Sequence, residues 1–283
     1  MKKLLTVLAI TFIISACEEK QHTFKIDEDN FTKMGDVLII SRQNLARKIN
    51  HEFSGKPLIY NNDGDTVICQ TIGENAKGQW EKLLLDAKNI SDDEILSIQI
   101  IDSMPEFKQF TNIRMAKSPE RNKEFTEVKE EVRPDDYVER TFPLIYQMEG
   151  PGWENEIVGF RMYYDERNGI DIFGKRTQEL VLDNVGIDED YHQLQDWGMD
   201  ILKVGNSLGA GALAIMIDDS VYKLGDVDEE TFTIMHEGPL MSSFLLKYKG
   251  WEPADRNINL NHKISIFKGM PGYLSEVTFE GLK

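Results

Sequence analysis

The chain has 283 residues, of which 41% are hydrophobic, and its 49 acidic residues against 32 Lys and Arg give a formal net charge of −17. A chain of this composition buries a sizeable core, which excludes global disorder. The acidic excess, with no basic block beyond the first residues, also excludes nucleic acid as a partner, because binding to nucleic acid depends on Lys and Arg.

The first 17 residues have the pattern of a lipoprotein signal sequence. Two lysines after the initial Met form a positive n-region, residues 4–14 are apolar, and the small residues Ser15 and Ala16 follow. The apolar run is too short to span a bilayer as a helix, which takes about 20 residues. A cysteine directly after these small residues is typical of a lipobox. We therefore predict a signal peptide over 1–16 and lipidation at Cys17, the alternative being an ordinary secretory signal.

The lipid anchor predicts a location and a tether. We expect an outer membrane lipoprotein of a Gram-negative bacterium, either periplasmic or exposed at the surface, that contacts the membrane through its lipid. The polar residues 17–34 are expected to form a flexible tether. Only Cys69 remains as a thiol after processing, so no internal disulfide is possible and stability must come from packing.

From residue 35 onward, short apolar or alternating runs separated by turn residues predict β-strands. Asp63-Gly64 between two β-prone runs predicts a hairpin, because the primed turns require positive φ at both central positions. A short helix is expected at 81–85, and the charged segment 116–140 is expected to be an exposed insertion or hairpin arm. Strands are expected at 37–40, 56–60, 66–70, 95–101, 160–165, 170–173 and 244–248.

Many short strands at close spacing predict an all-β, mainly antiparallel fold, a sandwich or barrel with few short helices. We expect a single β-rich domain over 35–283. The strand-like residues 277–279 close to the end of the chain are expected to leave a sheet edge unpaired.

Several familiar site motifs are absent from the sequence. The glycine-rich segment 205–211 lacks the Lys-Ser/Thr of a phosphate loop, so a close approach of two backbones explains it better. Zinc-ligand spacings and the Gly-x-Ser-x-Gly elbow are also missing. The acidic run 183–190 lacks the alternating ligand spacing of a calcium loop, so a solvated turn is favoured there. We predict no cofactor, although a divalent metal such as calcium is not excluded.

The segment 146–211 interleaves aromatic and charged residues, a composition suited to stacking on sugar rings and binding hydroxyls and carboxylates. In a strand over 160–165, the period of two places three apolar residues on the core face and Arg161, Tyr163 and Asp165 on the other face. The alternative is a sheet surface with ordinary cross-strand ion pairs. His192 precedes Asp200 and can exchange a proton near neutral pH, the alternative being a structural histidine.

These residues resemble a family described as a domain of unknown function, DUF4861. The matching pieces are Glu-Gly-Pro-Gly-Trp-Glu-Asn at 149–155, Gly-Phe-Arg at 159–161, Asp-Ile-Phe-Gly-Lys at 171–175, Tyr-His at 191–192 and Trp-Gly-Met-Asp at 197–200. The resemblance implies a β-supersandwich like those of galactose-mutarotase-like sugar epimerases, breakdown of acidic polysaccharides, and dehydration of a terminal uronic acid. It also implies a longer C-terminal part, so this chain is expected to be a truncated member.

The main hypothesis is an enzyme that acts on an acidic oligosaccharide or polysaccharide by β-elimination at a terminal uronic acid. Such chemistry needs a cation for the carboxylate and a base above the C5 proton. Arg161 is the predicted carboxylate-binding cation, His192 and Tyr163 are the predicted base and acid, and Asp200 is predicted to orient His192. The predicted substrate-binding residues are Trp153, Glu154, Arg167, Asn168 and Trp197, of which the two tryptophans would stack on sugar rings.

Two other classes of function remain open on sequence grounds. One is a non-catalytic surface lipoprotein that binds glycan and passes it to a transporter, which would use the same aromatic and acidic face. The other is a structural envelope protein with a conventional ion-paired surface. Product formation and glycan binding distinguish these three hypotheses.

Overall fold

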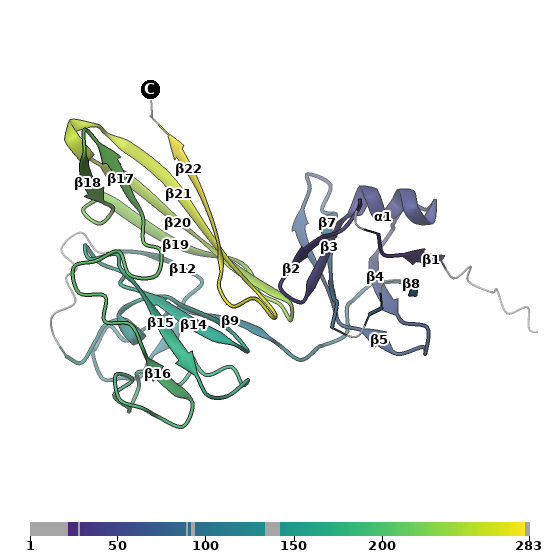
Figure 1. Cartoon of the computed structure of the whole chain (residues 1–283), viewed down its shortest axis with the longest axis horizontal. Coiled ribbons are helices and arrows are strands. Elements are labelled where there is room, and N and C mark those ends of the chain that lie inside the picture. Colours follow the sequence, from purple (N-terminus) through teal and green to yellow (C-terminus); the bar gives the residue numbers. More distant parts are fainter. Residues whose placement is uncertain (1–21, 28, 89, 92–93, 134–141, 281–283) are drawn as a thin grey trace, which may run out of the picture.

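The computed structural model describes residues 22–27, 29–88, 90–91, 94–133 and 142–280, and these form mostly antiparallel β-sheet. The prediction of an all-β fold is confirmed. Figure 1 shows a smaller N-terminal lobe beside a larger C-terminal lobe. In the described part of the chain, no helix has the length and apolar character needed to cross a membrane.

Two four-stranded sheets and one helix build the N-terminal lobe. Both sheets and the helix contribute to one core, which includes Ile59, Leu96, Ile40, Leu83 and Leu45. One sheet has the order β1-β8-β4-β5, and the other β2-β3-β7-β6. The elements are β1 (His22–Lys25), β2 (Thr32–Met34), β3 (Val37–Ser41), α1 (Arg42–Ile49), β4 (Lys56–Tyr60), β5 (Thr66–Val67), β6 (Cys69–Glu74), β7 (Trp80–Asp86) and β8 (Ile95–Ile101).

The N-terminal lobe corrects two expectations and bears out a third. Strands β1 and β2 belong to the sheets, so the expected tether does not extend to residue 34, and the signal sequence and Cys17 lie outside the described residues. The helix expected at 81–85 is strand β7, whose Leu83 and Leu84 are buried in different clusters on its two faces. A short apolar run does not distinguish the two structures. The predicted hairpin around Gly64 is confirmed as β4 and β5.

Two five-stranded sheets face each other across the core of the C-terminal lobe, which includes Trp153, Phe160, Phe244 and Ile264. The first sheet has the order β16-β15-β14-β13-β9, and the second β12-β19-β20-β21-β22. Their strands are β9 (Thr111–Arg114), β12 (Glu130–Val132), β13 (Gly152–Asn155), β14 (Val158–Met162), β15 (Ile170–Lys175), β16 (Gly198–Asp200), β19 (Glu229–His236), β20 (Met241–Trp251), β21 (Ile258–Phe267) and β22 (Leu274–Glu280).

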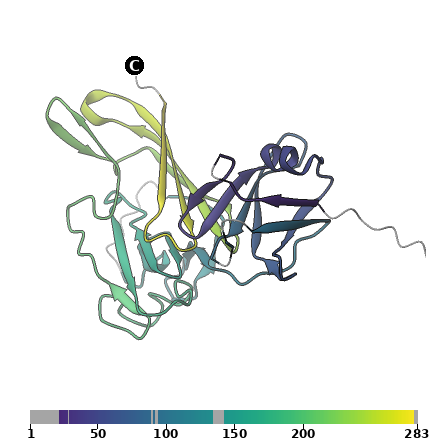
Figure 2. The ribbon, with the colours of Figure 1, turned by 45° about the vertical axis from the view of Figure 1, so that its right-hand side comes forward.

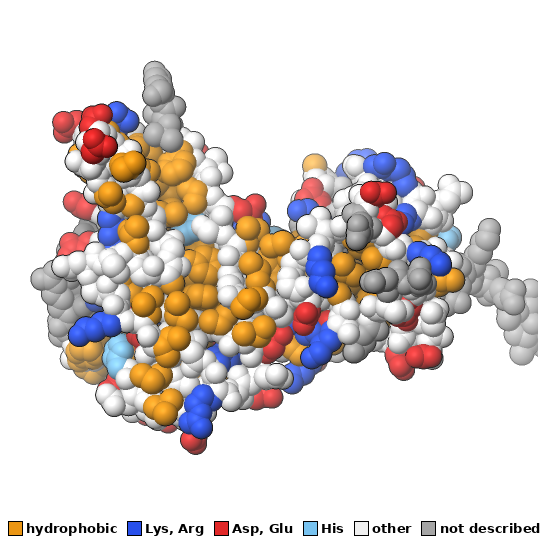
Figure 3. All heavy atoms as spheres, viewed as in Figure 1, with side chains coloured by type: hydrophobic (Ala, Val, Ile, Leu, Met, Phe, Trp, Pro, Cys, Tyr) orange, Lys and Arg blue, Asp and Glu red, His pale blue; other side chains and the backbone are white. Residues whose placement is uncertain are grey.

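Short hairpins and turns complete this lobe. Strand β10 (Ala116–Lys117) pairs with β11 (Thr126–Glu127), β17 (Ala214–Ile217) pairs with β18 (Ser220–Lys223), and single 3-10 turns span Gln147–Glu149 and Pro253–Asp255. The β10–β11 hairpin and β12 lie in the segment expected to be an insertion, of which residues 134–141 are outside the described part. Figure 3 shows hydrophobic side chains on this lobe near the β17–β18 hairpin, where Met216 and Val221 are exposed.

The two lobes have separate cores and share a small third one. Val37 and Leu84 of the N-terminal lobe pack there against Leu240, Met241 and Phe267, at the ends of β20 and β21 that reach the N-terminal lobe in Figures 1 and 2. We expected a single domain over 35–283, and the described residues of this range form two lobes joined through a common buried junction.

A buried amide fixes the register of this junction. The Gln70 carbonyl accepts from the backbone N–H groups of Leu240 at 3.0 Å and Met241 at 2.9 Å, and its amide nitrogen donates to the Met241 carbonyl at 2.8 Å. A second link runs from Lys268 Nζ to Asp86 at 2.7 Å. Because buried polar groups are costly when unpaired, these contacts make the junction specific.

Replacement of Gln70 by Ala is expected to destabilise the protein. The change leaves three buried backbone groups at β20 without partners, which costs about 2–4 kcal/mol of unfolding free energy. Urea denaturation followed by tryptophan fluorescence measures the loss. The control is Gln178→Ala on an exposed loop, with an expected change below about 0.5 kcal/mol. Equal midpoints for the two variants would contradict the role given to Gln70.

Candidate functional site

The β14–β15 hairpin carries the centre of the candidate site. Phe160, Met162 and Tyr164 are buried in the core of the C-terminal lobe, as the period of two predicts. Arg161 and Tyr163 point to the opposite side, where ionic side chains gather. Strand β14 ends at Met162, so Tyr163 lies just beyond its last residue.

Arg161 is fully buried and its guanidinium is surrounded by partners. Its Nε donates to Asp171 Oδ2 at 2.7 Å, and its Nη1 donates to the Met148 carbonyl at 2.9 Å and to Glu149 Oε1 at 3.1 Å. Its Nη2 donates to the Tyr163 hydroxyl at 2.8 Å and lies 2.5 Å from Asp171 Oδ2. The prediction that Arg161 binds a substrate carboxylate is therefore wrong, because the group is inaccessible and its donors are occupied.

Tyr163 lies between two guanidinium groups. The Cζ atoms of Arg161 and Arg167 are each 4.0 Å from the centre of its ring. Burial raises the pKa of Tyr163 to about 12, although the two cations act in the opposite direction. The negative charges of Asp171 and Glu149 act in the same direction as burial and also raise this pKa. The phenol thus keeps its proton at neutral pH and is able to donate it.

Arg167 is the more accessible of the two cations, with a side chain that is 38% exposed. Its Nε lies 3.0 Å from each Asp165 oxygen, and its Nη2 lies 2.5 Å from Glu149 Oε2. No described residue accepts a hydrogen bond from its Nη1, so the N–H groups of Nη1 remain available to a ligand. The substrate-binding role predicted for Arg167 remains compatible with this geometry.

An unusual turn places Glu149 between the two arginines. Met148 and Glu149 have φ of 57° and 65°, in the left-handed region, and Gly150 follows with φ of 153°. A Cβ at Gly150 would lie 2.3 Å from the Met162 carbonyl, so only glycine fits there. The turn thereby aims the Glu149 carboxylate at both guanidinium groups.

His192 is the most exposed member of the cluster, with 55% of its side chain accessible. Its Nδ1 lies 3.3 Å from Oδ2 of Asp200, a nearly buried residue of strand β16. The Asp200 backbone N–H donates to the Tyr191 carbonyl at 2.8 Å, which fixes the loop that carries His192. Burial, followed by the charge of Asp171, raises the pKa of Asp200. The predicted pairing of Asp200 with His192 is present in the structure.

The four predicted catalytic residues meet in one cluster. Asp200 Oδ2 lies 3.8 Å from Arg161 Nη2 and so links His192 to the Arg161–Tyr163 pair. Tyr191 closes the group, because its hydroxyl lies 3.5 Å from both Arg161 Nη1 and Glu149 Oε1. Four carboxylates therefore surround two guanidinium groups, and the cluster has an excess of negative charge that a protonated imidazole would reduce but not cancel.

Trp153, Glu154 and Asn168 are structural, which corrects the prediction that they bind substrate. Trp153 is fully buried between core aromatic rings. Glu154 is also buried, with Lys175 at 2.6 Å and the backbone N–H groups of 181 and 182 as its donors. Asn168 donates to the Leu224 carbonyl at 3.2 Å. Trp197 is half-buried, with its ring 5.7 Å from that of Phe173, and remains a candidate for stacking.

Sequence reasoning missed Glu149, Asp171 and Tyr191 as members of the site. Asp171 is detectable in principle, because strand β15 pairs it directly opposite Arg161 in the hairpin register. The left-handed turn that aims Glu149 has no comparable signal in the sequence. Its position follows from the close approach of the chain to β14.

The described residues contain no group of three or more His, Cys, Asp and Glu side chains arranged to hold a metal ion. In the acidic run 183–190, Asp183 accepts a hydrogen bond from the Asn112 side chain at 3.0 Å. The prediction about cofactors stays a prediction. What the cluster offers chemically is an exposed imidazole, a protonated phenol and a partly exposed guanidinium.

The family model described as "Domain of unknown function (DUF4861)" matches residues 27–283, so the chain belongs to this family. A relative from Formosa agariphila, named "Uncharacterized protein P7", is 31% identical over 137 residues. That match covers 41% of this chain and 34% of the relative, so the chain spans about a third of that protein. No solved structure matches the chain. The likeness to mutarotase-like supersandwiches therefore stays a prediction.

Replacement of Arg161 by Met is expected to destabilise the fold. The variant leaves Asp171 buried without its cation and Glu149 with Arg167 alone, and breaking a buried pair from one side costs about 3–5 kcal/mol. Differential scanning calorimetry measures the fall in Tm. The exposed Arg176→Met serves as the matched control and should change the unfolding free energy by less than about 0.5 kcal/mol. If the Arg161 variant has the same Tm as the control, Arg161 does not stabilise the fold.

Proposed function

We propose that the protein catalyses β-elimination at a terminal uronic acid of an acidic oligosaccharide, with the His192–Asp200 pair as its base. The observation that carries this proposal is the exposed His192 ring held at Nδ1 by a nearly buried carboxylate. A carboxylate this close to Nδ1 favours the imidazole tautomer that carries its proton on Nδ1, which leaves Nε2 able to accept a proton. No described residue hydrogen-bonds to Nε2.

The proposed reaction has two bond changes at the sugar. His192 Nε2 accepts the proton from C5, and the electron pair of that C–H bond forms the C4–C5 double bond. The C4–O bond breaks, and the leaving oxygen takes the proton of the Tyr163 phenol. The available Nη1 group of Arg167 stabilises the negative charge that develops on the uronic carboxylate. Each of these groups lies in the cluster around Arg161.

In this proposal Arg161 is a positioning residue. It holds the Tyr163 hydroxyl at 2.8 Å and lies between Asp171 and Glu149, so the phenol and the Asp200 carboxylate keep fixed places. The substrate class rests on the sugar-directed chemistry implied by the family resemblance. Trp197 supplies the aromatic face at the edge of the site.

Binding of glycan without catalysis is the second candidate function. Arg167 is already paired with Glu149 and Asp165, which reduces the charge that it offers to a uronic carboxylate. A neutral sugar needs no free cation, and the half-buried ring of Trp197 offers it a face for stacking. Tight binding with no product would support this alternative.

His192→Gln and Tyr163→Phe are expected to lower kcat by about 10²–10⁴ each, because positioned general acids and bases contribute by that factor. The readout is the ultraviolet absorbance of the conjugated enol product from oligosaccharides that end in a uronic acid. Tyr222→Phe, on strand β18, is the control and should keep full activity. If either site variant keeps the rate of the wild type while remaining folded, that residue has no part in the reaction.

The lipid anchor belongs to the same proposal, since it places the enzyme where exported polysaccharide fragments occur. Cys17 would carry the lipid and hold the protein at the outer membrane. Cys17→Ser is expected to abolish incorporation of an alkyne-labelled fatty acid and to move the protein from the membrane to the soluble fraction. Cys69→Ser, at a buried thiol, is the control. Labelling that persists in the Cys17 variant would contradict the anchor.

A further inference from the structure

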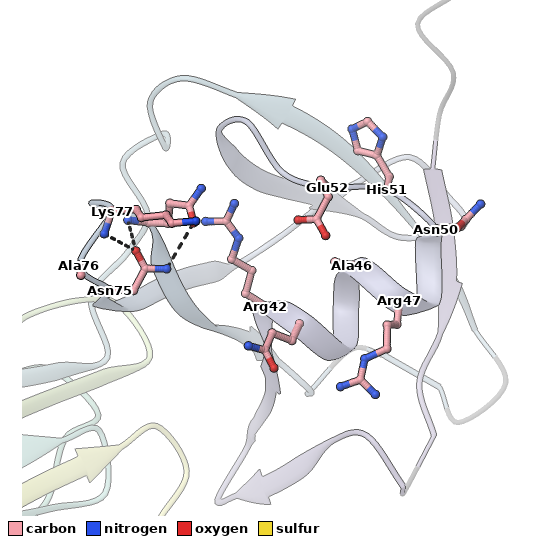
Figure 4. Close-up of a pocket in the computed structure, with 11 residues that line it drawn as sticks. Arg42, Ala46, Arg47, Asn50, His51, Glu52, Asn75, Ala76 and Lys77 are labelled. Atoms are coloured by element: carbon pink, nitrogen blue, oxygen red, sulfur yellow. Dashed lines mark hydrogen bonds between the residues drawn. The ribbon is translucent and has the colours of Figure 1, made fainter.

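The N-terminal lobe contains a polar cavity far from the candidate catalytic cluster in the sequence. It has a volume of about 770 Å³ and lies between helix α1 and the turn that joins β6 to β7. Figure 4 shows Arg42 pointing from the helix toward the turn that carries Asn75 and Lys77. The cavity lining includes the side chains of Arg42, Gln43, Arg47, Asn50, His51 and Lys77.

This cavity continues on both sides. A cavity of about 420 Å³ shares Arg42 and Gln79 with it, and another of about 870 Å³ shares His51. The larger neighbour also contains Tyr60 and Asn62, an aromatic face and an amide suited to sugars. We call these three adjoining cavities the α1 groove. The shared lining residues place the three cavities side by side, so a ligand longer than a single small ion has room to extend from the central cavity.

The charge around the central cavity is opposite to that of the chain. Arg42, Arg47 and Lys77 line it against the single carboxylate of Glu52, whereas the whole chain has a net charge of −17. Figure 3 shows Lys and Arg side chains over helix α1. The central cavity is therefore cationic and attracts anions locally, while Glu74 and Asp102 line the smaller neighbouring cavity.

Arg42 differs from the four ion-paired arginines of the C-terminal lobe in having no carboxylate neighbour. Arg114, Arg133, Arg161 and Arg167 each lie within 4.0 Å of an acidic side chain. Among the residues that the structure describes, no Asp or Glu oxygen is that close to Arg42. The positive charge of Arg42 is therefore available to an external anion.

The Arg42 guanidinium is also fixed in place. Its Nη2 donates to the Phe53 carbonyl at 2.6 Å, and its Cζ lies 5.3 Å from the centre of the Trp80 ring. Helix α1 begins at Arg42, with Ser41 as the N-cap that accepts from the Asn44 N–H. A side chain already ordered loses little entropy on binding, so its remaining donors form a prepared site.

We propose that the α1 groove is a second binding site, for an oligosaccharide that carries carboxylate or sulfate groups. Arg42 binds the oxyanion, and the exposed amides of Gln43 and Asn50 bind neighbouring hydroxyls. The charge of the ligand follows from the groove alone, whereas its identity as a glycan rests on the proposed function. Such a site would hold a substrate chain on the N-terminal lobe, separately from the reaction site.

Hydrogen exchange of the full chain tests this proposal directly. Tetragalacturonate, which carries carboxylates, and a κ-carrageenan tetrasaccharide, which carries sulfates, serve as probes, with neutral cellotetraose as the control. We expect protection of residues 42–52 and 75–79 with one or both anionic probes and none with cellotetraose. Protection by tetragalacturonate shows that the groove accepts carboxylates, and protection by the κ-carrageenan tetrasaccharide shows that it accepts sulfates. Raised salt concentration should weaken the binding.

Arg42→Gln is expected to weaken groove binding about tenfold, the effect of losing one charge-assisted contact. Lys77→Gln, at an exposed turn, should weaken it less and without risk to the fold. Arg256→Gln, which removes an exposed charge from the other lobe, is the matched control and should bind as the wild type does. Equal affinity of the Arg42 and Arg256 variants would overturn the proposal.

Two further outcomes separate this proposal from the reaction. In the folded His192→Gln variant, groove protection should persist while product formation is lost, so failure of the catalytic proposal leaves the groove intact. If product forms in the wild type but residues 42–52 gain no protection, the groove proposal is wrong and the catalytic one stands. Protection that appears only with anionic lipid vesicles would also overturn it and indicate a membrane contact.

Discussion

The buried guanidinium of Arg161 is the interaction on which the candidate site depends. A cation with no solvent access is stable only when carboxylates and carbonyls surround it, and here Asp171, Glu149 and the Met148 carbonyl do so. The same guanidinium orders the Tyr163 hydroxyl and approaches Asp200. Arg161, which the sequence analysis predicted to contact the substrate, thus acts on the site through the side chains that it holds in place.

This arrangement places a proton donor and a proton acceptor in the same acidic cluster. The phenol of Tyr163 is partly buried and keeps its proton, while the His192 imidazole lies at the exposed edge with Asp200 behind it. Two groups in different environments, one donor and one acceptor, are what an elimination needs. The backbone turn at Glu149 completes the cluster by bringing a carboxylate to both arginines.

Each of the two lobes carries one of the two candidate sites. The candidate catalytic cluster belongs to the C-terminal lobe, and the α1 groove belongs to the N-terminal lobe. Arg42 of the groove lacks carboxylate partners of the kind seen around Arg161 and Arg167. The junction around Gln70 and Lys268 connects them through specific buried contacts rather than a long linker. A ligand held on one lobe would therefore have a defined position relative to the other.

The sequence by itself determined the β-rich class, the core face of Phe160, Met162 and Tyr164, and the pairing of His192 with Asp200. Local alternation and turn residues carry that information, because side chains on a strand alternate with a period of two. Only the tertiary structure decided that Trp153 and Arg161 are buried and that residues from His22 onward join a sheet. Burial depends on which segments pack over a residue, and those segments are distant in sequence.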